Sequence, residues 1–308
     1  DGVSWGADER LTNNSSISWH PSISASGTML IVVWYENRDG NFEIYYKRSL
    51  DRGSSWGADI RLTNHPAHSS HPSVSISGSV VYVVWSENRN GNSDIYFNSS
   101  TDGGISWGVD TRLTFDTAVQ LYPSVAVSGS DLHVVWHDTR DGNPVIYYKR
   151  SSDSGINWGS DTRLTNYAAL AVFPSISVSG EVVHVVWSDF RDYTINYEIY
   201  YIRSADGGVN WGPDIRLTNY TDNSEYPSLD VSGEIVHVVW ADRRDGNYDI
   251  YYKCSIDNGT NWRADIQLTN NTTISQFPSI TVSGQVVHAV WYDFRNGNNE
   301  IYYKRDPT

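Results

Sequence analysis

The 308-residue sequence has one cysteine, Cys254, and one methionine. A single cysteine cannot form an intramolecular disulfide bond, so no disulfide framework supports the fold. No apolar run approaches the roughly 18 residues of a membrane-spanning helix, and we expect no membrane insertion. No signal peptide is recognisable either, which favours a mature protein or a piece of a longer surface protein.

Positive charge is also scarce. The chain has 22 lysines and arginines against 36 acidic residues, for a net charge of -14. This balance repels phosphate backbones, so we expect no nucleic-acid partner. The sequence has no P-loop, no dinucleotide-binding fingerprint and no local Ser/His/Asp signature, so no cofactor is predicted.

A regular internal repeat dominates the sequence. Its box Ser-x-Asp-x-Gly-x-x-Trp occurs five times in full, with the aspartates Asp51, Asp102, Asp153, Asp206 and Asp257. A sixth box is split between the two ends, with Gly2 and Trp5 at the start and Asp306 and Thr308 at the finish. The tryptophans of successive boxes are 51, 51, 51, 53 and 51 residues apart.

Each repeat reads as four short strands. In the second repeat these are "HPSVSIS", "VVYVVWS", "SDIYFNS" and "DTRLTF", rich in β-branched and aromatic residues and separated by Gly, Asn, Asp and Pro. Four strands per repeat, six times over, predict a single all-β domain over residues 1–308, a six-bladed β-propeller with four antiparallel strands per blade. We expect the monomer to close its ring when residues 8–12 complete the last blade, which removes exposed sheet edges.

The box is interpreted as structural. Its Asp can accept hydrogen bonds from its own turn, its Gly permits a positive φ, and its Trp covers the hairpin and offers its indole N–H to a carbonyl. One Asp per box is too few for a calcium loop.

The boxes resemble the Asp-box (BNR) repeats of sialidase-type propellers over essentially every repeat. The segments "RDGNYDIYY", "RLTN" and "YPSLDVSG" also resemble the repeat of TolB-type propellers. Both resemblances imply six blades. Asp-box proteins include glycosidases, lyases, carbohydrate-binding proteins and interaction modules, so the fold does not decide the function.

Charged pairs Trp-x-(Asp/Glu)-x-Arg occur in all six repeats, with the arginines Arg38, Arg89, Arg140, Arg191, Arg244 and Arg295. Sialidases of this fold grip a substrate carboxylate with three arginines. A single substrate lacks sixfold symmetry, so a pair that occurs in every blade is not expected to be a substrate site. It instead favours a structural ion pair that holds each loop to itself or to its neighbour. The sialidase family's early Arg-Ile-Pro motif is absent, and no Tyr/Glu nucleophile pair can be assigned by motif.

Antiparallel strands place the boxes and the turns between first and second strands on one face of the propeller. The segments between blades and those between second and third strands then share the other face. There Asp222 and Glu225, in "YTDNSEYPS", are the acid/base candidates, with a solvated loop as the alternative.

Aromatic residues interrupt the regularity on that face. The ligand-binding candidates are Trp19, His20, His71, Tyr122, Tyr226 and Phe277 at the recurrent prolines, with Phe173 in the same series, and Tyr193 and Tyr197 in the longer loop "DFRDYTINYE". Such side chains stack on sugar rings or anchor protein partners. The alternative is that they cap the apolar interior.

Histidines give a weak metal signal. His65, His68 and His71 lie within seven residues and are zinc-ligand candidates, although no helix aligns them and no carboxylate or cysteine is interleaved. His133, His184, His237 and His288 recur at one strand position and are interpreted as packing residues.

The function predicted is a non-catalytic recognition module, extracellular or at the cell surface, that binds carbohydrate or protein on the face opposite the boxes. The alternatives are a glycoside hydrolase or polysaccharide lyase of the Asp-box type and a structural spacer in a larger surface protein.

Overall fold

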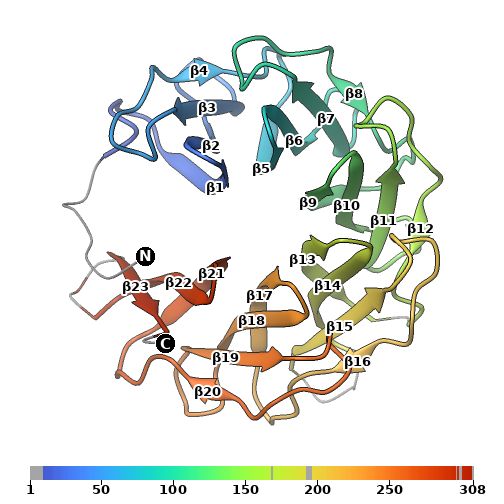
Figure 1. The fold of residues 1–308 in the computed structure, drawn as a ribbon, viewed down its shortest axis with the longest axis vertical. Helices are drawn as coiled ribbons and strands as arrows, with labels where there is room; N and C mark the ends of the chain where they lie inside the picture. Colours follow the sequence, from blue (N-terminus) through green and yellow to red (C-terminus); the bar gives the residue numbers. More distant parts are fainter. Residues whose placement is uncertain (1–9, 168, 192–195, 296, 298–299, 307–308) are drawn as a thin grey trace. The chain divides into compact units, whose positions relative to one another are not determined.

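The computed structural model describes residues 10–167, 169–191, 196–295, 297 and 300–306. Their strands form six antiparallel sheets, each made from strands consecutive in the sequence (Figure 1). The fold is an all-β six-bladed propeller, which confirms the predicted fold class. Blades are numbered here in chain order.

Every blade begins with a long strand that carries the recurrent proline. These first strands are β1 (Ser18–Ser26), β5 (Ser69–Ser77), β9 (Gln120–Ser128), β13 (Ala171–Ser179), β17 (Ser224–Ser232) and β21 (Ser275–Ser283). The second strands are β2 (Met29–Glu36), β6 (Val80–Glu87), β10 (Asp131–Asp138), β14 (Val182–Asp189), β18 (Ile235–Asp242) and β22 (Val286–Asp293).

The outer strands are shorter. The third strands are β3 (Glu43–Ser49), β7 (Asp94–Ser100), β11 (Val145–Ser151), β15 (Glu198–Ser204), β19 (Asp249–Ser255) and β23 (Glu300–Arg305). The fourth strands end at the first residue of each "RLT" segment, or of "QLT" in the fifth blade. They are β4 (Ile60–Arg61), β8 (Thr111–Arg112), β12 (Thr162–Arg163), β16 (Ile215–Arg216) and β20 (Ile266–Gln267).

The chain divides into two compact units. One comprises residues 7–163 and holds blades 1 to 3, and the other comprises residues 1–6 and 164–308 and holds blades 4 to 6. Within each unit the first strands of neighbouring blades pack against one another (Figure 1). The assignment of residues 1–308 to one domain stays a prediction. No helix in the described ranges has the length and apolar character to cross a membrane.

The second strands form the centre of each blade. In the first five blades the apolar runs are buried on both faces, and Trp85, Trp136, Trp187 and Trp240 are fully buried. Burial alternates along β22, where Val290 is 37% exposed. Because these strands lie between the first and third strands of the blade and most are buried on both faces, their sequences show no apolar–polar alternation.

The sixth blade has three strands, β21 to β23, among the described residues. The predicted closing strand, residues 8–12, lies partly outside the described residues. Gly2, Trp5 and Thr308 of the split box lie outside them as well. Leu11 is described. Its carbonyl accepts a hydrogen bond from Lys47 Nζ in the first blade, as the carbonyl of Leu113 does from Lys149 in the third. Ring closure stays a prediction.

Hydrogen bonds confirm the predicted division of loops between two faces. The box turn bonds to the turn between first and second strands, from Arg52 N to Thr28 O at 2.9 Å. At the opposite ends of the strands, on the other side of the propeller, Ser69 N donates to Phe42 O at 2.8 Å, which joins the segment between blades to the segment between second and third strands. We call this second side the loop face.

The boxes hold their own turns and also join blades. The carboxylate of Asp102 accepts hydrogen bonds from the backbone N–H groups of Ile105 and Ser106. The box also docks on the preceding blade, where the hydroxyl of Tyr46 donates to the carbonyl of Gly104. Sequence reasoning missed this second role, because the box motif names no partner outside itself.

The predicted indole hydrogen bond forms in some boxes only. Trp158 Nε1 donates to Gly155 O at 3.1 Å, and Trp262 Nε1 donates to Gly259 O at 3.2 Å. The indole nitrogen of Trp107 is buried and has no hydrogen-bond partner in the described part of the chain.

Candidate functional site

The six arginines of the Trp-x-(Asp/Glu)-x-Arg pairs are tied into their own blades. Each pairs with the carboxylate two residues before it, and in the first five blades also with the aspartate before the fourth strand, which is Asp59, Asp110, Asp161, Asp214 or Asp265. The guanidinium groups also lie over tyrosine rings, as Arg244 does over Tyr251 at 4.0 Å. The structural interpretation of these arginines is therefore confirmed.

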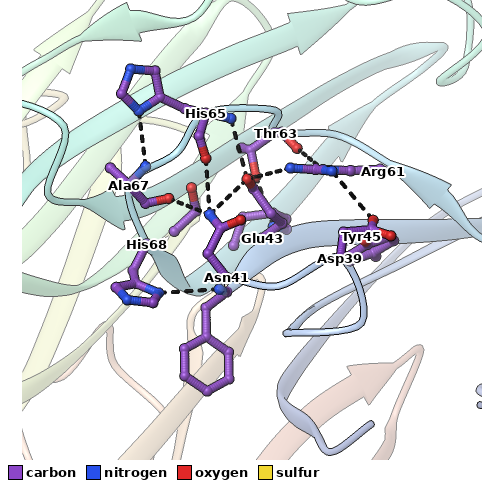
Figure 2. Close-up of polar contacts among 12 residues, drawn as sticks. Asp39, Asn41, Glu43, Tyr45, Arg61, Thr63, His65, Ala67 and His68 are labelled. Atoms are coloured by element: carbon purple, nitrogen blue, oxygen red, sulfur yellow. Dashed lines mark hydrogen bonds and ion pairs between the residues drawn. The ribbon is translucent and has the colours of Figure 1, made fainter. Parts of the chain in front are cut away.

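A second set of carboxylates also forms hydrogen bonds and ion pairs within the framework. Glu43 is fully buried and accepts hydrogen bonds from Asn41, Arg61, Thr63 and the backbone N–H of His65 (Figure 2). The counterparts in other blades with the same type of partner are Asp94, Glu198 and Asp249. These groups fix the segments on the loop face.

The three candidate zinc ligands have separate partners. His65 Nδ1 accepts from Ala67 N, and His68 Nδ1 accepts from Phe42 N, as Figure 2 shows. His71 packs against the rings of His20 and Tyr122 instead. Among the described residues, no group of three or more His, Cys, Asp or Glu side chains is placed to hold a metal ion.

The strand histidines are packing residues, as predicted. The Nδ1 atoms of His133, His184, His237 and His288 lie 2.7–2.8 Å from the hydroxyl of a tyrosine on the adjacent third strand.

The residue before each recurrent proline has a left-handed backbone. His20, His71, Tyr122, Phe173, Tyr226 and Phe277 have φ values between 45° and 55°. A register shift accompanies each of them, as between Trp19 and Ser22 in the first blade. Non-glycine residues seldom adopt this conformation, so the bulge, which recurs in all six blades, fixes where these rings point.

In residues 7–163, these rings form one group. The ring centroids of His71 and Tyr122 are 4.1 Å apart, and those of His20 and His71 are 4.9 Å apart. Burial and the neighbouring His20 and His137 lower the pKa of His71 to about 3. Trp19 lies beside this group in the sequence and is 47% exposed.

In residues 164–308, the second group contains stacked rings. Tyr226 stacks on Phe277 with centroids 4.0 Å apart, and Phe173 lies 4.8 Å from Tyr226. Phe277 is 44% exposed. Tyr197 contacts Phe190 and lies in this unit, whereas Tyr193 lies outside the described residues.

Glu225 stands beside the second group. It is the second residue of β17 and is only 9% exposed. The hydroxyl of Tyr248 donates a hydrogen bond to its Oε2 atom. Burial raises the pKa of Glu225, while the hydrogen bond from Tyr248 opposes this rise. Burial and the charge of Glu225 also raise the pKa of Tyr197.

Asn223 positions the tyrosines around Glu225. Its Oδ1 accepts a hydrogen bond from Tyr197 N at 2.9 Å, and its Nδ2 lies 3.4 Å from the hydroxyl of Tyr248. Ser224 N donates to the Tyr197 carbonyl at 2.8 Å. These bonds join the segments before β15, β17 and β19 at one point on the loop face.

Asp222 is oriented differently from Glu225. It accepts a hydrogen bond from Asn223 N, its carboxylate lies 4.0 Å from Arg243, and its side chain is 42% exposed. Sequence reasoning selected both carboxylates but missed Asn223 and Tyr248. Comparison of the same position across repeats gives a signal for Asn223, because Ile17, His68, Val119, Leu170 and Ile274 stand at its place in the other blades.

Comparison with known proteins identifies the fold but no family. No family model matches the sequence, and no curated protein matches it. The resemblance of the segments "RDGNYDIYY", "RLTN" and "YPSLDVSG" to TolB-type propellers therefore gains no support.

Solved structures do match. The GH93 α-L-arabinofuranosidase of Fusarium graminearum with arabinobiose superposes with a TM-score of 0.67 at 13% identity, over 94% of this chain and 92% of that chain. The NanB sialidase from Streptococcus pneumoniae gives 0.66 at 10% identity, over 96% and 69%. The Trypanosoma rangeli sialidase in complex with sialic acid gives 0.64 at 13% identity, and this chain spans about half its length (53%). The chain thus shares the propeller fold of sialidases and GH93 arabinofuranosidases.

Proposed function

We propose that this propeller is a non-catalytic carbohydrate-binding module, placed outside the cell or at its surface, with its ligand on the loop face. The observation that carries the proposal is the two groups of rings on the first strands. Stacked, partly exposed rings beside hydroxyl groups suit the apolar faces and polar edges of sugars.

The charges of the loop face favour a ligand without carboxylates. Arg38, Arg89, Arg140, Arg191 and Arg244 each already pair with two carboxylates, and their side chains are at most 25% exposed. A sugar carboxylate would have to compete with those pairs. We therefore propose neutral or cationic glycans rather than acidic ones.

The test is binding of the purified protein to a broad array of glycans and polysaccharides, with calcium and then with chelator. We expect a specific signal that Tyr226→Ala or Trp19→Ala removes. Ile105→Ala is the control, because Ile105 is 68% exposed and lies in a box turn on the opposite face. Absence of any glycan signal would overturn the proposal and favour a protein ligand.

Glycoside hydrolysis is a second candidate function, favoured by the raised pKa of Glu225. A pKa raised by burial is the direction that suits a general acid, and Asp222 is the second carboxylate available in the same segment. The test is release of reducing ends from any glycan that binds. Glu225→Gln is expected to slow release at least 100-fold, and release at the wild-type rate would exclude this role.

A further inference from the structure

We infer that Glu225, Tyr248 and Tyr197 form a subsite for the protonated amine of an amino sugar. This inference rests on the proposed function, because it names the class of glycan that the loop face selects.

The first argument is the unusual environment of Glu225. Most framework carboxylates of the loop face, such as Glu43 and Asp242, pair with arginine side chains. Asp249 instead accepts hydrogen bonds from Thr269 and Gln267. Glu225 is also buried, at 9% exposure against 0% for Glu43 and Asp242, but its hydrogen bond comes from the neutral hydroxyl of Tyr248. In the described ranges, no lysine or arginine forms an ion pair with it.

The second argument is energetic. A buried carboxylate without a cation is costly, and a hydrogen-bonded cation offsets part of that cost. A ligand ammonium group would supply the missing charge and three hydrogen-bond donors. A neutral hydroxyl group would supply one donor and leave the charge uncompensated, so the amine is the preferred ligand.

The third argument is the small residue that stands opposite Glu225 in the fifth blade. Ala241 stands directly opposite Glu225 in the register of β17 and β18. The corresponding residues in other blades are Tyr35, Ser86, His137, Ser188 and Tyr292. The fifth blade thus combines the charged residue with the smallest opposite side chain, and the net charge of -14 adds long-range attraction for a cation.

The position tolerates a neutral amide, which makes a clean test possible. Gln276 occupies the equivalent place in the sixth blade, where its Oε1 accepts a hydrogen bond from Tyr292 at 2.8 Å. Glu225→Gln therefore removes the charge and retains an acceptor for Tyr248, and we expect this variant to fold.

The experiment compares glucosamine oligosaccharides with N-acetylglucosamine oligosaccharides of the same length, by titration calorimetry at pH 6.5 and low salt. These ligands differ at one nitrogen, which is a protonated amine in the first and an uncharged acetamide in the second. We expect the wild-type protein to bind the free amine at least tenfold more tightly, and Glu225→Gln to reduce this ratio to about one. Glu234→Gln, at an exposed turn between β17 and β18, is the matched control and should keep the wild-type ratio.

Equal affinity of the wild-type protein for both oligosaccharides would overturn the subsite and leave carbohydrate binding intact. An unchanged ratio in Glu225→Gln would also overturn it. Failure of both oligosaccharides to bind, when other glycans do, would reject the amine as the ligand. Failure of every glycan would reject the proposed function itself.

Discussion

The hydroxyl of Tyr46 donates a hydrogen bond to the carbonyl of Gly104, 2.8 Å away in the box of the next blade. Both residues are buried, so this bond joins two blades inside the protein. Phe97 holds the same place in the second blade and contacts Trp158 without a hydroxyl group. The joint between blades thus keeps its ring packing where the hydrogen bond is absent.

Tyr46→Phe should therefore destabilise the protein without unfolding it. The Gly104 carbonyl would lose its donor, at a cost of about 1–2 kcal/mol in the free energy of unfolding. Urea denaturation of the variant and the wild type measures this difference. A loss above about 4 kcal/mol would contradict the view that ring packing carries most of the contact.

Arg244→Ala should cost more. Arg244 pairs with the fully buried Asp242 and with Asp265, and it lies over the rings of Tyr220 and Tyr251. Removal of one member of a buried pair typically costs about 3–5 kcal/mol. Urea denaturation should show a loss of this size. A variant of wild-type stability that had lost glycan binding would reverse the structural assignment of Arg244.

Acid should weaken the box turns. Hydrogen bonds from Asn261 and Ser255 lower the pKa of Asp257 to about 2, below its ordinary value of 3.8. The unfolded chain therefore binds the proton first, and the stabilising contribution of Asp257 is complete above pH 3.8 and is lost as the pH falls through about 2. The difference in Tm between the wild type and Asp257→Ala should shrink over that range. A difference independent of pH would contradict this account.

His71 should make stability depend on pH at milder acidity. Its folded pKa of about 3 lies below the ordinary value of 6.5, so stability is lost as the pH falls from 6.5 toward 3. The neighbouring rings are His20, Tyr35 and Tyr122, and the charge of His137 acts in the same direction.

Phe occupies the equivalent position at Phe173 and Phe277, so His71→Phe is a matched variant. Its Tm should fall less than that of the wild type between pH 7 and pH 4. If the two proteins had parallel profiles of Tm against pH, protonation of His71 would not lower the stability of the folded protein, and this prediction would be wrong.

Ring closure gives a further prediction. In the described residues Arg295 has one carboxylate partner, Asp293, whereas Arg244 has two. We expect the closing strand, residues 8–12, to supply the second, because Asp8 in "GADERLT" stands where Asp59 stands in "GADIRLT". Asp8→Asn should lower Tm by several degrees, and Asp1→Asn is the control. Equal Tm values for both variants would argue against closure by this segment.

The sequence predicted the strands and blades well because their signals are local and repeated. The apolar runs that end in Trp85 and Trp136 and the boxes around Asp102 and Asp153 repeat every 51 residues, so each repeat supports the assignment of the others. The role of the paired arginines followed from the same regularity.

The candidate site was only partly predictable. Glu225 was found because an acidic residue is unusual in its segment, but its contact with Tyr248 joins residues 23 positions apart. Such a contact depends on how loops from successive blades meet, which residue spacing does not determine. Burial of Glu225 likewise depends on neighbours from other segments.

The bulge before each proline presents one further residue per blade, immediately before the aromatic ring. These residues are Trp19, Ser70, Leu121, Val172, Glu225 and Gln276, and they share no size, charge or polarity. The backbone hydrogen bonds and ion pairs of the framework do not involve most of these side chains. Each blade therefore has one position at which the side chain can vary while the framework contacts are kept. Exchange of these residues among blades would test whether they set the selectivity of the proposed site.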